Sequence, residues 1–318
     1  MPLETTFTMD TTSLKIGAGA TREVGVDLAN MGVRRVMVVT DANLSASETV
    51  QTALKALSDQ NLDAVLYDQV EVEPTDQSFL AAAAFATAGN FDGYVAVGGG
   101  SVMDTAKAAN LYATYPADLL DYVNPPIGKG KPVPGRLKPL IAIPTTAGTG
   151  SETTGVAIFD LLEIGAKTGI AHRALRPALG IIDSDNTRTL PPMVAACSGL
   201  DVLCHAIESL TAIPYSQRPA PESPHLRPAY QGANPISDIW AAKALEMVAT
   251  YLVRAISDPA DSEAREQLLL AAAYAGIGFG NAGVHLPHGM SYPVSGLVRS
   301  FQPPGTTSII RSSHTACR

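Results

Sequence analysis

The sequence has little positive charge, few cysteines and no long uninterrupted hydrophobic run. Its 22 lysines and arginines are outnumbered by 30 aspartates and glutamates, which gives a formal net charge of −8. An acidic chain lacks the basic face that nucleic-acid binding requires, so we expect no nucleic-acid partner. The three cysteines have no disulfide-framework spacing, which fits a reducing compartment. No apolar run reaches the roughly 18 residues that span a bilayer, so we expect no membrane association.

The N-terminus shows no targeting signal. Residues 1–10 are mildly acidic and resemble neither a signal peptide nor an arginine-rich transit peptide. We therefore expect a cytoplasmic protein, with the mitochondrial matrix as the alternative if a transit peptide is missing from this chain. At 318 residues, 46% of them hydrophobic and 16% charged, the chain is a globular protein long enough for two domains.

The first half of the chain alternates short apolar runs with helical patterns. Four runs read as buried strands, at 35–41, 62–67, 91–97 and 139–144, and three segments have helical character, at 46–59, 76–89 and 102–114. Strands that alternate with helices predict a parallel sheet covered on both faces. We therefore predict an α/β domain over residues 1–190.

The second half changes to helical periodicity. Apolar residues recur at helical spacing within 193–212, 236–257 and 262–274, which predicts an all-α domain over residues 191–297. Residues 217–232 are rich in proline, arginine and polar residues and are expected to form a long ordered loop. Residues 298–318 show no periodicity and are expected to form an aberrant, poorly ordered tail.

A glycine-rich loop follows the third predicted strand. It reads Gly98-Gly99-Gly100-Ser101 and opens a helix that carries Asp104 at capping-box-like spacing from the serine. Backbone N–H groups at such a helix start can bind a phosphate. A side chain at Gly99 would block that approach or strain the backbone. On its own, the loop is equally consistent with an ordinary glycine turn.

A second loop, 144–152, also follows a predicted strand and carries hydroxyl groups at Thr145, Thr146 and Thr149. Two such loops at the carboxyl ends of parallel strands predict a nucleotide-binding crevice. Asp41 closes the first predicted strand and is placed to accept hydrogen bonds from a ribose hydroxyl and to disfavour a 2′-phosphate. A plain turn aspartate is an equally valid interpretation of Asp41.

Two segments of the helical half carry candidate metal ligands. Asp201 and His205 are spaced i and i+4, which places both side chains on one face of a helix. Their apolar surroundings favour a buried site over a surface ion pair. Further along the chain, His288 is the better third candidate. His285 is a candidate for one of three roles: a second ligand, a proton carrier or a packed core histidine.

Four motifs in the same order resemble the iron-containing (group III) alcohol dehydrogenases. They are Gly-Gly-Gly-Ser-Val-Met-Asp-Thr-Ala-Lys from 98, Pro-Thr-Thr-Ala-Gly-Thr-Gly-Ser-Glu from 144, Gly-Leu-Asp-Val-Leu-Cys-His-Ala-Ile-Glu from 199 and His-Gly-Met-Ser-Tyr-Pro from 288. Residues 230–240, Tyr-Gln-Gly-Ala-Asn-Pro-Ile-Ser-Asp-Ile-Trp, are most similar to the hydroxyacid–oxoacid transhydrogenase subgroup. The resemblance extends from about residue 13 to residue 297.

The resemblance implies a Rossmann-like dinucleotide-binding domain over 1–190 and an all-helical metal-binding domain over 191–297, with metal and nicotinamide in the cleft between them. It implies NAD and a divalent metal as cofactors, with Fe²⁺ as the first candidate and Zn²⁺ as the second. The implied NAD-binding residues are Asp41, Gly98, Gly99, Gly100, Ser101, Asp104, Thr145, Thr146, Thr149 and Lys167, and the implied metal ligands are Asp201, His205 and His288.

The chain departs from the family pattern at two points. The family has a fourth metal ligand, a histidine in a second Pro-His-Gly sequence, and no such sequence follows His288. The chain therefore looks C-terminally truncated, with a foreign tail after about Leu297. Many family members also have a proton-carrying histidine where this chain has Tyr292, so His285 and Tyr292 are the candidate catalytic residues.

The implied activity is hydride transfer from a small hydroxyacid resembling 4-hydroxybutyrate, through bound NAD, to an oxoacid resembling 2-oxoglutarate. Arg218 and Arg227 are candidates for binding the substrate carboxylates, with exposed loop arginines as the alternative. One alternative function is an NAD-dependent alcohol or 4-hydroxybutyrate dehydrogenase with exchangeable cofactor. Another is a catalytically impaired nucleotide-binding remnant. The expected partners are these small molecules and, as an open possibility, further copies of the chain.

Overall fold

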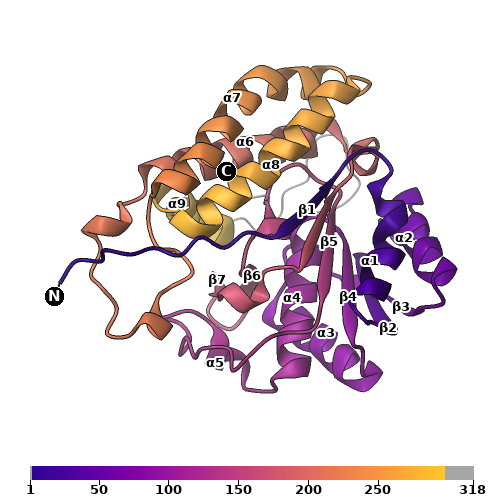
Figure 1. The fold of residues 1–318 in the computed structure, drawn as a ribbon, viewed down its shortest axis with the longest axis horizontal. Helices are drawn as coiled ribbons and strands as arrows, with labels where there is room; N and C mark the ends of the chain where they lie inside the picture. The colour runs from indigo at the N-terminus through magenta and orange to yellow at the C-terminus, as the bar shows by residue number, and fades with distance from the viewer. Residues whose placement is uncertain (1, 298–318) are drawn as a thin grey trace. The chain divides into compact units, whose positions relative to one another are not determined.

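The computed structural model of the protein describes residues 2–297 (Figure 1). The chain divides into two compact units. The sheet unit comprises Thr12–Thr146 and Gly155–Thr189. The helical unit comprises Met1–Thr11, Ala147–Thr154 and the chain from Leu190 onward. Because two short segments from within residues 1–190 belong to the helical unit, the domain limits drawn from the sequence stay a prediction. The predicted tail at 298–318 lies outside the described residues.

The sheet unit is built on one six-stranded sheet whose neighbouring strands are all parallel. The strand order is β1-β8-β5-β4-β2-β3. The strands are β1 (Ser13–Ile16), β2 (Arg35–Asp41), β3 (Asp63–Val70), β4 (Gly93–Gly98), β5 (Leu140–Pro144) and β8 (Leu179–Ile182). The predicted α/β fold with a parallel, Rossmann-like sheet is confirmed, and the carboxyl ends of β4 and β5 lead into the two predicted loops.

Alternating side chains of the strands bury the two faces of the sheet under different helices. Val36 and Val38 of β2 pack in one core with α1 (Val24–Asn30) and α2 (Glu48–Asp59). Met37 and Val39 pack in a second core on the opposite face. That face is covered by α3 (Asp76–Gly89) and α4 (Gly100–Thr114), as Figure 1 shows. This alternation is the period-2 pattern of a strand buried on both faces.

Smaller elements complete the sheet unit. An antiparallel hairpin pairs β6 (Val156–Leu161) with β7 (Ala166–Ala171), and α5 (Leu119–Tyr122) forms one turn. Short 3₁₀ helices in the two units lie at Ala20–Glu23, Ser151–Thr153, Arg173–Leu175, Ser184–Thr187, Tyr215–Gln217 and Pro224–Leu226. Strands β1, β6, β7 and β8 have no counterpart among the predicted strands.

The helical unit contains α6 (Pro192–Thr211), α7 (Pro235–Ser257), α8 (Ser262–Ala282) and α9 (Leu286–Leu297). Local capping explains where two of these helices begin. The Asn234 side chain accepts hydrogen bonds from two backbone N–H groups at the start of α7, and the Asp261 side chain caps α8 in the same way. Glycine lets the segment Ala147–Thr154 approach α8, because a Cβ on Gly276 would lie 2.1 Å from the Thr153 hydroxyl.

Helix α6 is long and apolar enough to resemble a membrane span by length and hydropathy, and α8 with α9 passes the same test as a bent pair. About half of the α6 window, 44%, is buried inside the protein. Asp201 and Glu208 interrupt its apolar sequence and contact histidine side chains. These features are those of a core helix, since buried helices of globular proteins are also apolar on most sides.

Candidate metal and cofactor sites

Two helices of the helical unit bring the three predicted metal ligands together. Asp201 and His205 lie one turn apart on α6, and His288 lies on α9. The Asp201 Oδ1 atom is 3.8 Å from His205 Nε2 and 3.4 Å from His288 Nε2. One ligand atom from each residue lies within 4.8 Å of the other two. One carboxylate oxygen and two imidazole nitrogens that converge in this way suit a divalent metal such as Fe²⁺ or Zn²⁺.

A fourth residue of the cluster, Glu208, was not predicted from the sequence. Its side chain is fully buried, and its Oε1 atom is 2.5 Å from Nδ1 of His288. The backbone N–H of His285 donates to the other carboxylate oxygen. A carboxylate on the far nitrogen of a histidine orients the ring and leaves Nε2 directed at a metal. The spacing holds the signal, because Glu208 follows Asp201 by seven residues and so lies on the same face of α6.

Burial and neighbouring charges separate the protonation behaviour of the two histidines. Burial lowers the pKa of His205 to about 4, against the opposing charge of Asp201, so this imidazole is neutral near neutral pH, as a metal ligand must be. Burial also acts to lower the pKa of His288, but hydrogen bonds to Asp201 and Glu208 and their charges raise that pKa to about 9. The His205 ring stacks on Phe279 with centroids 3.9 Å apart, which fixes its plane.

The two candidate proton carriers lie beside this cluster. Nε2 of His285 is 2.9 Å from the Thr211 hydroxyl at the end of α6. Tyr292 follows His288 by four residues on α9 and therefore lies on the same side of that helix. The backbone N–H of His285 also donates to Glu208 of the cluster, and the catalytic roles of His285 and Tyr292 stay predictions.

In the sheet unit, the two predicted nucleotide loops lie side by side. Thr145 donates its backbone N–H to the carbonyl of Gly98 at 3.1 Å. A Cβ placed on Gly99 would lie 3.4 Å from the Thr146 side chain. Gly100 begins α4, so the N-terminus of this helix faces the same strand ends. Exposed N–H groups at such a helix start fit an anionic phosphate.

One expectation for Gly99 is wrong. Its φ is −80° and its ψ is −171°, an extended conformation that any residue adopts, so a side chain there would not strain the backbone. The neighbouring glycine is constrained by packing instead, because a Cβ on Gly98 would lie 2.5 Å from Val102.

The acidic residues predicted to bind NAD have partners within the sheet unit. The Asp41 carboxylate accepts the backbone N–H groups of Asn43 and Leu44, which is the turn interpretation of that residue. The Asp104 carboxylate accepts the N–H of Ile158 at 2.9 Å and lies 3.5 Å from the Lys107 ammonium.

The other two predicted NAD-binding residues lie in different units. Lys167 on β7 is buried and forms ion pairs with Glu73 and Asp160. Thr149 belongs to the segment Ala147–Thr154 of the helical unit, where its hydroxyl accepts the N–H of Ser151.

The predicted loop at residues 217–232, here called the proline-rich insertion, is ordered by contacts within the helical unit. Arg227 pairs with Glu4 at 3.0 Å, and both side chains are largely buried. Arg218 donates to the carbonyl of Tyr230 at 2.7 Å. Both arginines therefore have intramolecular partners, which favours a structural role over carboxylate binding.

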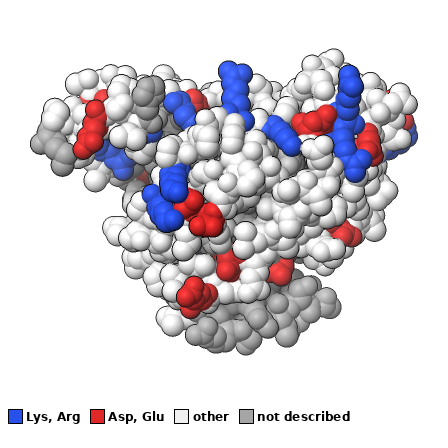
Figure 2. Space-filling view, turned by 90° about the horizontal axis from the view of Figure 1, so that it is seen from below, with Lys and Arg blue, Asp and Glu red and all other residues white. Residues whose placement is uncertain are grey.

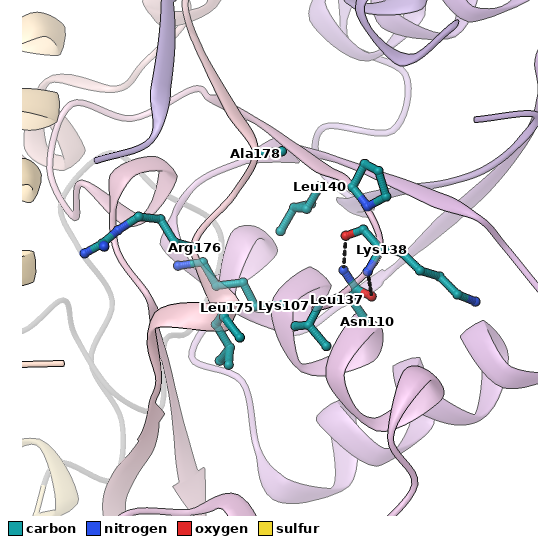
Figure 3. Close-up of a pocket in the computed structure, with 10 residues that line it drawn as sticks. Lys107, Asn110, Leu137, Lys138, Leu140, Leu175, Arg176 and Ala178 are labelled. Atoms are coloured by element: carbon teal, nitrogen blue, oxygen red, sulfur yellow. Dashed lines mark hydrogen bonds between the residues drawn. The ribbon is translucent and has the colours of Figure 1, made fainter. Parts of the chain in front are cut away.

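A small cavity lies away from these loops, at the amino ends of β5 and β8. Its volume is about 160 Å³, and Lys107, Asn110, Lys138 and Arg176 are among its lining residues. Asn110 and the backbone of Lys138 share two hydrogen bonds, drawn in Figure 3. The side chains of Lys138 and Arg176 extend away from each other in this view. The Lys107 ammonium donates to the carbonyl of Val156 at 2.7 Å, so this cation is engaged within the protein, and we assign no ligand to the cavity.

Charged side chains of both signs occur on the surface. Figure 2 shows one face of the molecule on which lysine and arginine side chains lie beside aspartates and glutamates. On the face seen in this view, the charges of both signs are mixed, and the expectation of no nucleic-acid partner stays a prediction.

Comparison with known families identifies the family to which the chain belongs. The model of the iron-containing alcohol dehydrogenase family matches residues 11–184, and the C-terminal model of the Fe-containing alcohol dehydrogenase family matches residues 229–300. The chain belongs to the iron-containing alcohol dehydrogenase family. The predicted resemblance to this family is thereby confirmed.

A curated relative shows which kind of family member the chain is similar to. The chain is 61% identical over 298 residues to the mitochondrial hydroxyacid-oxoacid transhydrogenase of Mus musculus. That alignment covers 93% of this chain and 64% of the mouse protein, so the chain spans slightly less than two thirds of the length of this relative.

Solved structures agree with the fold. The iron-containing alcohol dehydrogenase of Thermococcus thioreducens is 31% identical with a TM-score of 0.77, covering 90% of this chain and 70% of that chain. Sulfoacetaldehyde reductase from Bifidobacterium kashiwanohense, solved in complex with NAD⁺, is 29% identical with a TM-score of 0.78, covering 92% of this chain and 72% of that chain.

Proposed function

We propose that the protein is a metal-dependent oxidoreductase of the hydroxyacid–oxoacid transhydrogenase type. It moves a hydride from a hydroxyacid such as 4-hydroxybutyrate to an oxoacid such as 2-oxoglutarate, with NAD as the hydride carrier. The products are succinate semialdehyde and 2-hydroxyglutarate. The observation that carries the proposal is the convergence of Asp201, His205 and His288, in a chain that is 61% identical to a protein named for this reaction.

The donor set fits a divalent metal, with Fe²⁺ as our first assignment and Zn²⁺ as the second. When bound, such a metal polarises the substrate oxygen as a Lewis acid, and NAD accepts and returns the hydride. Asp201, His205 and His288 would hold the metal, and Glu208 would keep the His288 ring aligned.

The chain's own residues would handle the proton. Oxidation of the hydroxyacid releases one proton from its hydroxyl group, and reduction of the oxoacid takes one up at the carbonyl oxygen. We assign this proton to His285, whose Nε2 lies 2.9 Å from the Thr211 hydroxyl, and to Tyr292 on α9. In the sheet unit, the helix start at Gly99–Ser101 would hold the pyrophosphate, with Thr145 and Thr146 beside it.

An isotope experiment tests the proposal against its alternatives. The full chain is loaded with Fe²⁺ and NAD and incubated with 2-oxoglutarate and 4-hydroxybutyrate that carries deuterium at C4. Mass spectrometry then measures deuterium at C2 of 2-hydroxyglutarate, in the presence of excess unlabelled NADH. The transhydrogenase predicts full transfer of the label, because the cofactor stays bound. Diluted label indicates a dehydrogenase with exchangeable cofactor. If a metal-replete, NAD-bound sample forms no 2-hydroxyglutarate, the result supports the alternative of a catalytically impaired nucleotide-binding remnant.

The names of the relatives bear on the expected location of the protein. The curated relatives are named as mitochondrial proteins, which does not support the expected cytoplasmic location. We propose the alternative, the mitochondrial matrix, where 2-oxoglutarate would be the acceptor. Fractionation of cells that express the native gene, followed by immunoblotting of the matrix and cytosol, measures this directly.

A further inference from the structure

Glu73 has a backbone conformation that its residue type disfavours. Its φ is +59°, in the left-handed region. Within residues 2–297, the other non-glycine residues with positive φ are Asn61 and Asn90, and asparagine tolerates this region better than most residue types. Glutamate has no such advantage, so a requirement for its side chain must offset the strain.

The contacts of Glu73 identify that requirement. Its carboxylate lies 2.5 Å from the buried ammonium of Lys167, and its backbone N–H donates to the Ser101 hydroxyl at 3.2 Å. One residue thus touches both the first turn of α4, which follows the glycine loop, and β7 of the hairpin. Glycine at position 73 would retain the N–H bond and remove the strain, but it would lose the contact with Lys167.

Neighbouring bonds show that this junction is built into the sheet unit. The N–H of Asp160 donates to the carbonyl of Pro74 at 2.8 Å, and the Asp160 carboxylate is 3.0 Å from the Lys167 ammonium. The Lys167 side chain is only 4% exposed. Two carboxylates therefore contact one ammonium, and its position is defined by charge-assisted hydrogen bonds.

We propose that Glu73 is a positioning residue for dinucleotide binding, which fixes Lys167 and Ser101 relative to each other at the end of the sheet that carries the glycine loop. The inference rests on the proposed function, which places Ser101 at the pyrophosphate, and on the NAD-binding role that the family resemblance implies for Lys167. Glu73 acts through its two neighbours and is not itself a catalytic residue. The strain at this position is retained because a carboxylate is needed there.

The test exploits the left-handed conformation. Glu73→Gly in the full chain is compared with Asn90→Gly, at an exposed left-handed position that ends α3. Glycine adopts positive φ without strain, so Asn90→Gly should keep or raise the melting temperature. In Glu73→Gly the same gain opposes the loss of the ion pair with Lys167, which keeps Asp160 as a partner, so this variant should remain folded. Only Glu73→Gly should weaken NAD⁺ binding in calorimetry, by about tenfold, which corresponds to about 1.4 kcal/mol. Weakened binding in a variant that remains folded, set against unchanged binding in Asn90→Gly, separates the positioning role from a loss of fold.

Other outcomes overturn the inference in distinguishable ways. Unchanged NAD⁺ affinity in folded Glu73→Gly removes the positioning role and leaves the proposed function intact. A parent chain that binds no NAD⁺ removes the proposed function and the positioning role with it. If Glu73→Gly does not fold, Glu73→Gln takes its place, because the amide keeps the length and accepts a hydrogen bond but carries no charge. Unchanged affinity in that variant also overturns the inference, and a severalfold loss supports it.

Discussion

Glu208 on α6 holds Nδ1 of His288 on α9 at 2.5 Å, so a fully buried carboxylate connects the two helices that carry the candidate metal ligands. The same carboxylate receives the backbone N–H of His285, where the chain enters α9. It therefore fixes both the ring of His288 and the start of the helix that presents it. This connection assembles the ligand set from the protein's own hydrogen bonds.

Replacing Glu208 with glutamine should weaken metal binding without abolishing it. The amide can still accept a hydrogen bond from Nδ1 of His288, but it lacks the negative charge that raises the basicity of the ring, and residues in this position typically contribute about 10- to 100-fold to metal affinity. Competition with a chelator, followed by elemental analysis, measures the change. Glu246→Gln, at an exposed glutamate of α7 that pairs with Lys243, serves as the matched control and should leave affinity unchanged. Equal affinities in both variants would show that Glu208 serves only the packing of α6 against α9.

Asp201→Ala should abolish metal loading and leave NAD⁺ binding largely intact. Asp201 is the residue whose oxygen faces both histidines, at 3.4 and 3.8 Å, so its loss removes the anionic ligand. The glycine loop belongs to the other compact unit and keeps its own contacts. On the same preparation, elemental analysis measures the metal content and calorimetry measures the affinity for NAD⁺. Parent-like metal content in Asp201→Ala would exclude this residue from the site.

The sequence predicted the site best where ligands share one helical face. Asp201 and His205 are spaced by four residues within an apolar helix, and this spacing alone brings the two side chains together. Glu208 lies on the same face, but a glutamate near a helix end is usually solvent-exposed, and only its tertiary contact with His288 distinguishes it. Helix α9 was not predicted because it contains Pro293 and Gly289, both unfavourable in helix interiors.

The fold was predictable where strands are fully buried. Strands β2, β4 and β5 are continuous apolar runs and lie in the middle of the sheet. Strand β1 is short, partly exposed and at the sheet edge, so its sequence carries little periodicity. Strand β7 contains alanine, lysine and glycine and forms through backbone pairing with β6, which intrinsic preference does not indicate.

Gly99→Val should eliminate NAD⁺ binding in a folded protein. The extended backbone at Gly99 accepts a side chain, and the nearest atoms of Thr146 lie at ordinary contact distance, so stability should change little. A branched side chain would nonetheless occupy the space through which a phosphate reaches the start of α4. Gly98→Ala is the contrasting variant, because its Cβ would collide with Val102 and lower the melting temperature. Unchanged NAD⁺ affinity in Gly99→Val would remove the phosphate role from this loop.

Arg227→Ala should lower stability and should not selectively weaken acidic substrates. The arginine pairs with Glu4 at 3.0 Å and thereby attaches the insertion to the N-terminal segment. Glu4→Ala should therefore lower the melting temperature in the same direction, and the double variant should lose less than the sum of the two, since both remove one interaction. Lys243→Ala, at an exposed ion pair, is the control and should change little. The KM values for carboxylate and neutral substrates should shift together in Arg227→Ala. A rise in KM confined to carboxylate substrates would instead show that the guanidinium leaves Glu4 to bind the substrate.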